Sequence, residues 1–143
     1  MRTAAWLVVV LGLAVGLAAP PARADEAAFT VTIVKATNDG DSIDPALEQF
    51  AGLLKNRGYT NFTKIGTVAF ALKEKETRKF GVAGNVSAEI EYLNEVNNRV
   101  AFKCRVFEGG RKALEVSYSI PRGGKTMVVF RGQVAYMLII EIR

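Results

Sequence analysis

Histidine is absent from the 143-residue sequence, and cysteine occurs only once. Without histidine the chain cannot build a histidine-based catalytic triad, a histidine-ligated zinc site or a histidine general base. It also lacks the Ser-x-x-Lys and Gly-x-Ser-x-Gly motifs and the glycine loops that cradle nucleotide phosphates. These absences remove most hydrolase designs, and we expect a protein that is not an enzyme and carries no cofactor.

The lone cysteine, Cys104, cannot form an internal disulfide, so stability has to come from packing. It alternates with Phe102 and Val106 on one side of a strand pattern, which predicts a buried thiol that behaves as a small apolar core residue. The alternative is an intermolecular disulfide, which would require the thiol at the surface.

One long apolar run stands at the start of the chain. Residues 4–19 carry no charge, follow Arg2 and end at two prolines, after which Ala22 and Ala24 offer small side chains to a signal peptidase. This pattern predicts an export signal over residues 1–24. A retained membrane anchor fits less well, because a span needs ~20 apolar residues.

We therefore expect a protein exported to the periplasm or beyond with a bacterial type of signal. A single globular β-rich domain would cover residues 25–143, with no transmembrane segment left after cleavage. Loss of Arg2 and Arg23 lowers the formal net charge from +5 to +3. So small a charge argues against nucleic acid as a partner.

Apolar and polar residues alternate through most of the remaining chain. In residues 28–35, Phe29, Val31 and Ile33 alternate with polar residues, which predicts a first strand. The same kind of pattern, interrupted by turn residues, predicts further strands near residues 62–72, 77–82, 86–93, 99–107, 112–120, 126–131 and 133–142.

One amphipathic helix is predicted after the first strand. Asp44 and Pro45 supply its N-cap and first residue, and Gly58 marks its end. Its apolar stripe consists of Leu47, Phe50, Ala51 and Leu54. The final strand is apolar on both faces, which is typical of a strand covered on both sides. The sequence thus predicts a β-rich α+β fold, a two-layer β-sandwich of about seven or eight mostly antiparallel strands with the helix packed on a sheet.

The middle strands allow a prediction of register. A hairpin centred on Val96 would pair apolar residues on the inner face and place Glu89 opposite Lys103 on the outer face. The inner pairs would be Tyr92 with Val100, Ile90 with Phe102, Ala88 with Cys104 and Val86 with Val106. The next strand would place Glu115 opposite Arg105. Each cross-strand pair of opposite charge stabilises a sheet by ~0.2–1 kcal/mol.

An acidic loop precedes the helix and is the candidate metal site. Asp39, Asp41 and Asp44 bring hard oxygen ligands together beside a glycine, as calcium requires. The loop is not an EF-hand, because Ala46 stands where the closing glutamate belongs. In the alternative interpretation Asp44 caps the helix, and Asp39 and Asp41 lie near its positive N-terminal end.

Basic residues gather in three predicted turns, where they could contact an acidic glycan, a lipid headgroup or an acidic protein surface. They are Lys73, Lys75, Arg78, Lys79, Arg111, Lys112, Arg122 and Lys125. Joint binding requires that the three turns lie at one end of the sandwich. The alternative is that these are solvated loop charges.

Together these observations predict an exported, non-catalytic binding or structural module, such as an accessory or subunit of a cell-envelope assembly. Its partner would be a protein or an envelope component, bound at an exposed apolar patch or an unpaired sheet edge. A calcium- or anionic-glycan-binding domain is the alternative. A third interpretation, a small histidine-free hydrolase, needs two carboxylates in a cleft, whereas the strand register gives Glu89 and Glu91 an electrostatic role.

Overall fold

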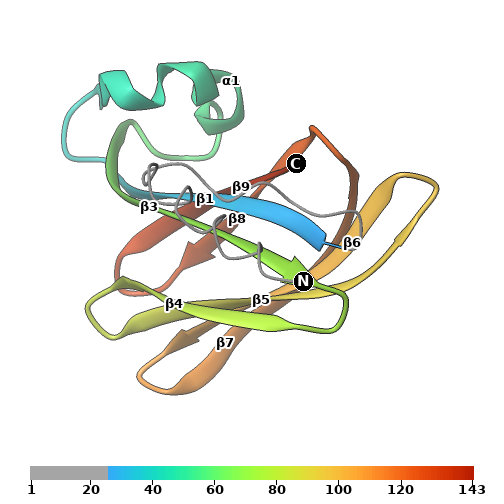
Figure 1. Ribbon diagram of the computed structural model, residues 1–143. Coiled ribbons are helices and arrows are strands. Elements are labelled where there is room, and N and C mark those ends of the chain that lie inside the picture. Colours follow the sequence, from blue (N-terminus) through green and yellow to red (C-terminus); the bar gives the residue numbers. More distant parts are fainter. Residues whose placement is uncertain (1–25) are drawn as a thin grey trace, which may run out of the picture.

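The structure is a computed structural model that describes residues 26–143 (Figure 1). The predicted export signal, residues 1–24, lies outside the described residues. The strands are β1 (Glu26–Thr37), β2 (Ser42–Ile43), β3 (Asn61–Lys73), β4 (Thr77–Ala83), β5 (Val86–Val96), β6 (Arg99–Glu108), β7 (Arg111–Pro121), β8 (Lys125–Arg131) and β9 (Ala135–Ile142). The helical segments are a 3-10 helix, η2 (Pro45–Phe50), and α1 (Ala51–Leu54).

The strands form two sheets that pack face to face. The five-stranded sheet has the order β2-β3-β1-β9-β8, and the four-stranded sheet has the order β4-β5-β6-β7. All neighbouring strands are antiparallel except β2 and β3, which are parallel. Figure 1 shows the helical segment over the face of the five-stranded sheet that is turned away from the other sheet. The predicted β-rich α+β fold, a two-layer sandwich with one helix packed on a sheet, is therefore confirmed.

Two hydrophobic cores hold these layers together. Between the sheets, the Phe29 ring lies 5.7 Å from Phe70 and 5.5 Å from Phe102, measured between centroids. The second core lies between the five-stranded sheet and the helical segment, where Leu47 and Leu54 are fully buried. Burial of each such side chain stabilises the fold by about 1.5–3 kcal/mol.

Strand β9 belongs to both cores. It lies between β1 and β8, with Leu138 and Ile140 in the core between the sheets and Met137 and Ile139 in the core beneath the helical segment. The two faces of the strand are thus both buried, which is why its sequence is apolar without alternation. The prediction that both sides of this strand are covered is confirmed.

The helix is shorter than its sequence pattern indicates. The Asp44 carboxylate accepts the N–H of Ala46 at 3.0 Å, as expected of an N-cap, but α1 ends at Leu54 rather than near Gly58. Lys55 is already extended, and Asn56 has a φ of 60°. The chain leaves the helix early because it must turn back to begin β3, so the predicted final turn does not form.

The predicted register of the hairpin formed by β5 and β6 is wrong by two residues. Ile90 pairs with Cys104, and Glu89 pairs with Arg105. The cause is the turn, in which Asn97 has a φ of 54° and is followed by a second asparagine with φ 64°, as in a two-residue type I′ hairpin. This turn shifts the pairing by three residues, and a bulge after Tyr92 takes one residue back, which leaves the shift of two.

A shift of two residues keeps every side chain on its predicted face, because side chains alternate with a period of two. Ile90 therefore still faces the core and Glu89 still faces outward, although each has a different partner. The predicted pairing of Arg105 with Glu115 is confirmed.

Candidate strand-binding edge

Sheet edges expose unpaired backbone groups, and proteins usually protect them with charges, proline, bulges or short strands. In the four-stranded sheet both edges have such protection. Strand β4 carries Arg78 and Lys79 and a bulge near its end. Strand β7 carries Arg111 and Lys112 at its start and Pro121 at its end. These two edges are poor templates for a further strand.

The β8 edge of the five-stranded sheet is also protected. This strand is short and has Lys125 and Arg131 at its two ends. From the other sheet, the Tyr118 hydroxyl donates a hydrogen bond of 3.1 Å to the Met127 carbonyl. A backbone acceptor in the middle of β8 is therefore occupied.

The remaining edge differs, because β2 pairs with only the first two residues of β3. Just beyond them, the Asp44 carboxylate accepts the Lys64 N–H at 3.2 Å. At the far end of the strand, Glu76 accepts the Lys73 N–H at 2.8 Å. Between these two points, residues 66–72 have no strand on their outer side within the described chain. We call residues 66–72 the open β3 edge.

Antiparallel hydrogen bonding alternates, and this shows which backbone groups point away from the sheet. Ala28 and Arg143 exchange both backbone bonds, at 3.0 and 2.9 Å, so Ala28 turns toward β9. Every second residue of β1, counted from Ala28, therefore points its N–H and C=O groups toward β9, and the residues between them point theirs toward β3. The register partners of those intervening residues, in β3, point their backbone groups back toward β1. The β3 residues between those partners present their N–H and C=O groups at the open edge. They are Thr67, Ala69 and Ala71.

Within residues 66–72 the open β3 edge has no charge, proline or bulge, although a bulge at Ile65 and the lysines at positions 64 and 73 lie at its ends. Residues 66–72 contain no charged residue and no proline, and they span about 20 Å of extended chain. The side chains beside the outward backbone groups are small, and those of Thr67 and Ala69 are exposed. At one end lies Ile65, a large apolar residue that is 41% exposed. Another extended chain could therefore approach closely.

Four of the predicted basic residues lie beside this edge. Lys73 ends β3, Lys75 lies in the following turn, and Arg78 and Lys79 lie on β4, which faces β3 across the sandwich (Figure 1). Arg78 points inward, and its guanidinium carbon lies 5.2 Å from the centroid of the Phe70 ring. The cation therefore sits at the opening between the two sheets.

Lys64, which sequence analysis did not single out, lies at the other end of the open β3 edge. Together with the four residues above it forms a group that we call the flanking cations: Lys64, Lys73, Lys75, Arg78 and Lys79. Within residues 26–143 no member of this group forms an ion pair. The carboxylates nearby in sequence, Glu74 and Glu76, accept hydrogen bonds from backbone N–H groups. These carboxylates and Asp44 keep their negative charge while they accept hydrogen bonds, but the five flanking cations outnumber them, so this side of the sandwich has an excess of positive charge.

The other predicted basic residues do not join this group. Arg111 and Lys112 follow the turn at the opposite end of the four-stranded sheet, where the Gly109 N–H bonds to the Asn85 carbonyl at 3.0 Å. Lys125 lies over the Phe50 ring at 5.7 Å. The three basic turns thus do not share one end of the sandwich.

Arg122 has a structural role in the turn between β7 and β8. It donates two hydrogen bonds to the Glu95 carboxylate, at 2.9 and 2.8 Å, and further bonds to the carbonyls of Arg143 and Glu26. The hydrogen bonds from Arg122 lower the pKa of Glu95 below its ordinary value. This cation is already matched by a carboxylate and ties three strand ends together.

Glu89 and Glu91, the carboxylate pair considered for a hydrolase, share one guanidinium. Arg105 donates to Glu89 at 3.1 Å, to Glu91 at 2.9 Å and to Glu115 at 3.2 Å. Hydrogen bonds to these carboxylates, first of all Glu91, raise the pKa of Arg105. Lys112 is the main cause of a lowered pKa at Glu115. The pair is thus part of an ion-paired network on the outer face of the four-stranded sheet.

The acidic loop does not gather its carboxylates. Asp44 accepts the N–H groups of Ala46 and Lys64, and these two bonds, the first being the stronger influence, lower its pKa. Asp39 and Asp41 are exposed. No group of three candidate metal ligands occurs within the described residues. The geometry matches the capping interpretation of Asp44.

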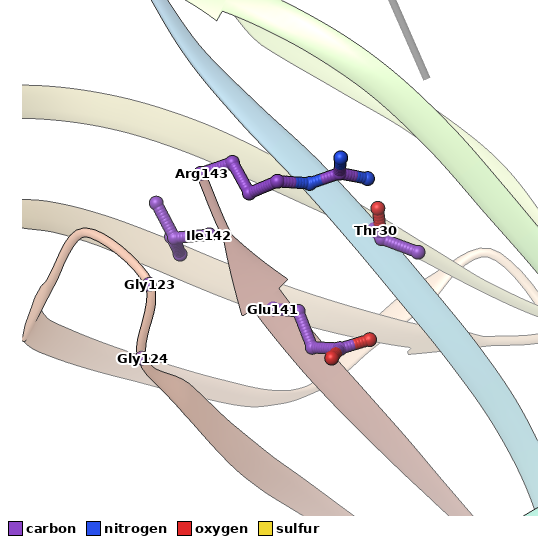
Figure 2. Close-up of a pocket in the computed structure, with 6 residues that line it drawn as sticks. All are labelled: Thr30, Gly123, Gly124, Glu141, Ile142 and Arg143. Atoms are coloured by element: carbon purple, nitrogen blue, oxygen red, sulfur yellow. The ribbon is translucent and has the colours of Figure 1, made fainter. Parts of the chain in front are cut away.

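Two hollows lie at opposite ends of the five-stranded sheet. One, of about 220 Å³, is lined by Thr30, Glu141, Arg143 and the glycines of the β7–β8 turn (Figure 2). The other, of about 410 Å³, includes Lys35 and Asp39 in its lining. Each hollow has a single carboxylate side chain, so neither holds the pair that a glycosidase requires.

The Cys104 side chain is fully buried in the core between the sheets. Burial raises the pKa of its thiol to about 12. The residue thus occupies the inert position that its alternation with Phe102 and Val106 predicts.

Comparison of the chain with protein-family models, with characterised proteins and with solved structures found no match. Across residues 26–143, no helix has the length and apolar character needed to cross a bilayer. Function therefore has to be inferred from the residues themselves.

Proposed function

We propose that the protein is an exported, non-catalytic binding module that adds an extended segment of another protein to the open β3 edge. The observation that carries this proposal is the run of outward backbone groups at Thr67, Ala69 and Ala71, beside which no described strand lies. The export signal predicted at residues 1–24 supports a role in the cell envelope, as a subunit or accessory of an assembly there.

Binding by strand addition uses main-chain hydrogen bonds for affinity and side-chain positions for selectivity. Each of the three outward residues offers one donor and one acceptor. Every bond formed contributes a net ~0.5–1.5 kcal/mol, because the same groups bond to water in the free protein. The small side chains of Ala69 and Ala71 let the two backbones reach hydrogen-bonding distance without rearrangement.

A capped seven-residue peptide of alternating threonine and valine provides the test. We expect the peptide to slow amide hydrogen exchange at Thr67, Ala69 and Ala71, measured by NMR, because these N–H groups become hydrogen-bonded. Ala69→Pro removes the central donor and should abolish the protection. The matched control is Ala113→Pro, placed at the bulge of the β7 edge, which should leave peptide binding intact. A folded protein that shows no protected amide on β3 with any extended peptide contradicts the proposal.

A further inference from the structure

We infer that the segment received by the open β3 edge is acidic, with carboxylates at its two ends and one near its centre on the inward side. This inference rests on the proposed strand addition and specifies the chemistry of the partner. Its basis is the position of the flanking cations relative to the backbone groups at Thr67, Ala69 and Ala71.

Two of the flanking cations bracket the edge on its outer face. Phe62 packs beneath the helical segment, so Lys64 shares that face by alternation. Lys73 shares the face of Ala69 and Ala71 by the same rule. A strand laid along residues 66–72 would therefore have a lysine near each end, on the face away from the four-stranded sheet. The Asp44 and Glu76 carboxylates lie at the same two points, but they accept the N–H groups of Lys64 and Lys73 along the edge itself.

Arg78 lies where it could contact the inward face of an added strand. Its guanidinium lies over the Phe70 ring, close to the middle of the open β3 edge, and no carboxylate within the described residues pairs with it. A carboxylate on the inward side of an added strand, at the level of Phe70, would meet this cation. Apolar residues on either side of that carboxylate would meet Val68 and Leu72, which line the same side.

The same charges disfavour a second copy of this chain as the added strand. Antiparallel pairing of two β3 edges about Ala69 would bring the Arg78 side chains of both copies to the middle of one seam and Lys73 of each copy near Lys64 of the other, where like charges repel. An exposed edge bordered by unpaired cations is thus protected from self-association and open to an acidic strand. Charge complementarity of this kind mainly governs partner choice and the rate of encounter.

Three capped peptides test the inference, with sequences Glu-Val-Thr-Glu-Thr-Val-Glu, Gln-Val-Thr-Gln-Thr-Val-Gln and Lys-Val-Thr-Lys-Thr-Val-Lys. We expect the acidic peptide to bind roughly tenfold tighter than the neutral one, because about three exposed ion pairs form. The lysine peptide should bind most weakly. Salt at about 0.5 M should remove most of the difference, since it screens exposed charges. Fluorescence anisotropy of labelled peptides gives the affinities.

Variants and amide exchange separate the inference from the proposed function. Arg78→Gln should reduce the preference for the acidic peptide, whereas Arg111→Gln, at the opposite end of the sheet, should leave it unchanged. Equal binding of the three peptides, with protected amides at Thr67 and Ala69, would overturn the acidic specificity and leave strand addition standing. Absence of protection with all three would overturn strand addition itself. A dimer in sedimentation that Ala69→Pro dissociates would assign the edge to a second copy instead.

Discussion

The outer face of the four-stranded sheet and the open β3 edge both carry several cations, but their surroundings differ. On the outer face, Arg105 bonds to Glu89, Glu91 and Glu115, which the register of β5, β6 and β7 places around it. Beside the open β3 edge, Arg78 has an aromatic ring and no carboxylate within the described residues. Cations matched by the register stabilise the sheet, whereas unmatched cations beside free backbone groups are available to a partner.

Proline substitution should give the largest difference in the free energy of unfolding between a paired strand and the open β3 edge. Ala101→Pro in β6, which has neighbours on both sides, should cost roughly 3 kcal/mol, because it removes a ladder hydrogen bond and leaves a carbonyl unpaired. Ala69→Pro should cost less than about 1 kcal/mol, because its N–H points to solvent. Urea denaturation measures both. Equal losses would show that the Ala69 N–H is bonded in the native protein.

Replacing Arg105 on the outer face and Arg78 beside the open β3 edge should give a smaller difference in stability than the two proline substitutions. Arg105→Met leaves Glu89, only 8% exposed, without its cation and should destabilise the protein by about 2 kcal/mol. Arg78→Met should cost about 0.5 kcal/mol or less, since an exposed cation–π contact is weak. Thermal and urea unfolding of both variants provide the measurement. A loss for Arg78→Met as large as that for Arg105→Met would mean that Arg78 is structural.

Low pH should weaken the ion pairs of the matched cations, because it protonates their carboxylate partners. The pKa of Glu95 is lowered by Arg122 and that of Glu115 chiefly by Lys112, so both carboxylates stay charged in the folded protein below the ordinary value of 4.5. A depressed folded pKa contributes stability above the unfolded value, and that stability is lost as pH falls through the folded value. The urea midpoint should therefore decline below pH 4.5.

Two variants check the origin of this acid dependence. Glu95→Gln and Glu115→Gln should each flatten the decline below pH 4.5, because each removes one of the shifted groups. The affinity of the open β3 edge for a neutral strand should change with pH only where the protein itself unfolds. An unchanged acid profile in both variants would mean that other carboxylates control the acid limit.

Calcium should have the smallest effect. Asp44 is committed to the N–H groups of Ala46 and Lys64, and its carboxylate does not join Asp39 and Asp41 in a metal-binding group. Calcium at about 5 mM, above the Kd range of weak extracellular modules, should leave the melting temperature unchanged. A rise in melting temperature that Asp39→Asn abolishes would restore the calcium interpretation.

The predictions that succeeded depend on local sequence. The alternation in β1 and the uninterrupted apolar run of β9 identify strands and their buried faces, because each side chain's direction follows from its position along the strand. The same local logic identified Asp44 as a cap. The predicted register of β5 and β6 failed because it depends on a bulge and on a two-asparagine turn, which apolar pairing alone does not distinguish from a shift of two residues.

The candidate site was only partly visible in the sequence. Four of the five flanking cations were singled out, yet they were grouped with basic residues that lie elsewhere, and Lys64 was missed because it falls inside a strand. The uncharged run of residues 66–72 is a signal that could have drawn attention to β3. Such a run is equally consistent with a strand in the middle of a sheet, so the sequence could not identify it as an edge.

The sequence by itself determined which segments form the eight longer strands, which of their faces are buried, and that histidine chemistry is excluded. These follow from composition and from a side-chain period that each strand carries independently. Only the tertiary structure decided that β3 is left open beyond β2 and that Arg78 lies over Phe70, with no carboxylate of residues 26–143 paired to it. Edges depend on the order of strands, and strand order arises from pairings between residues far apart in the chain.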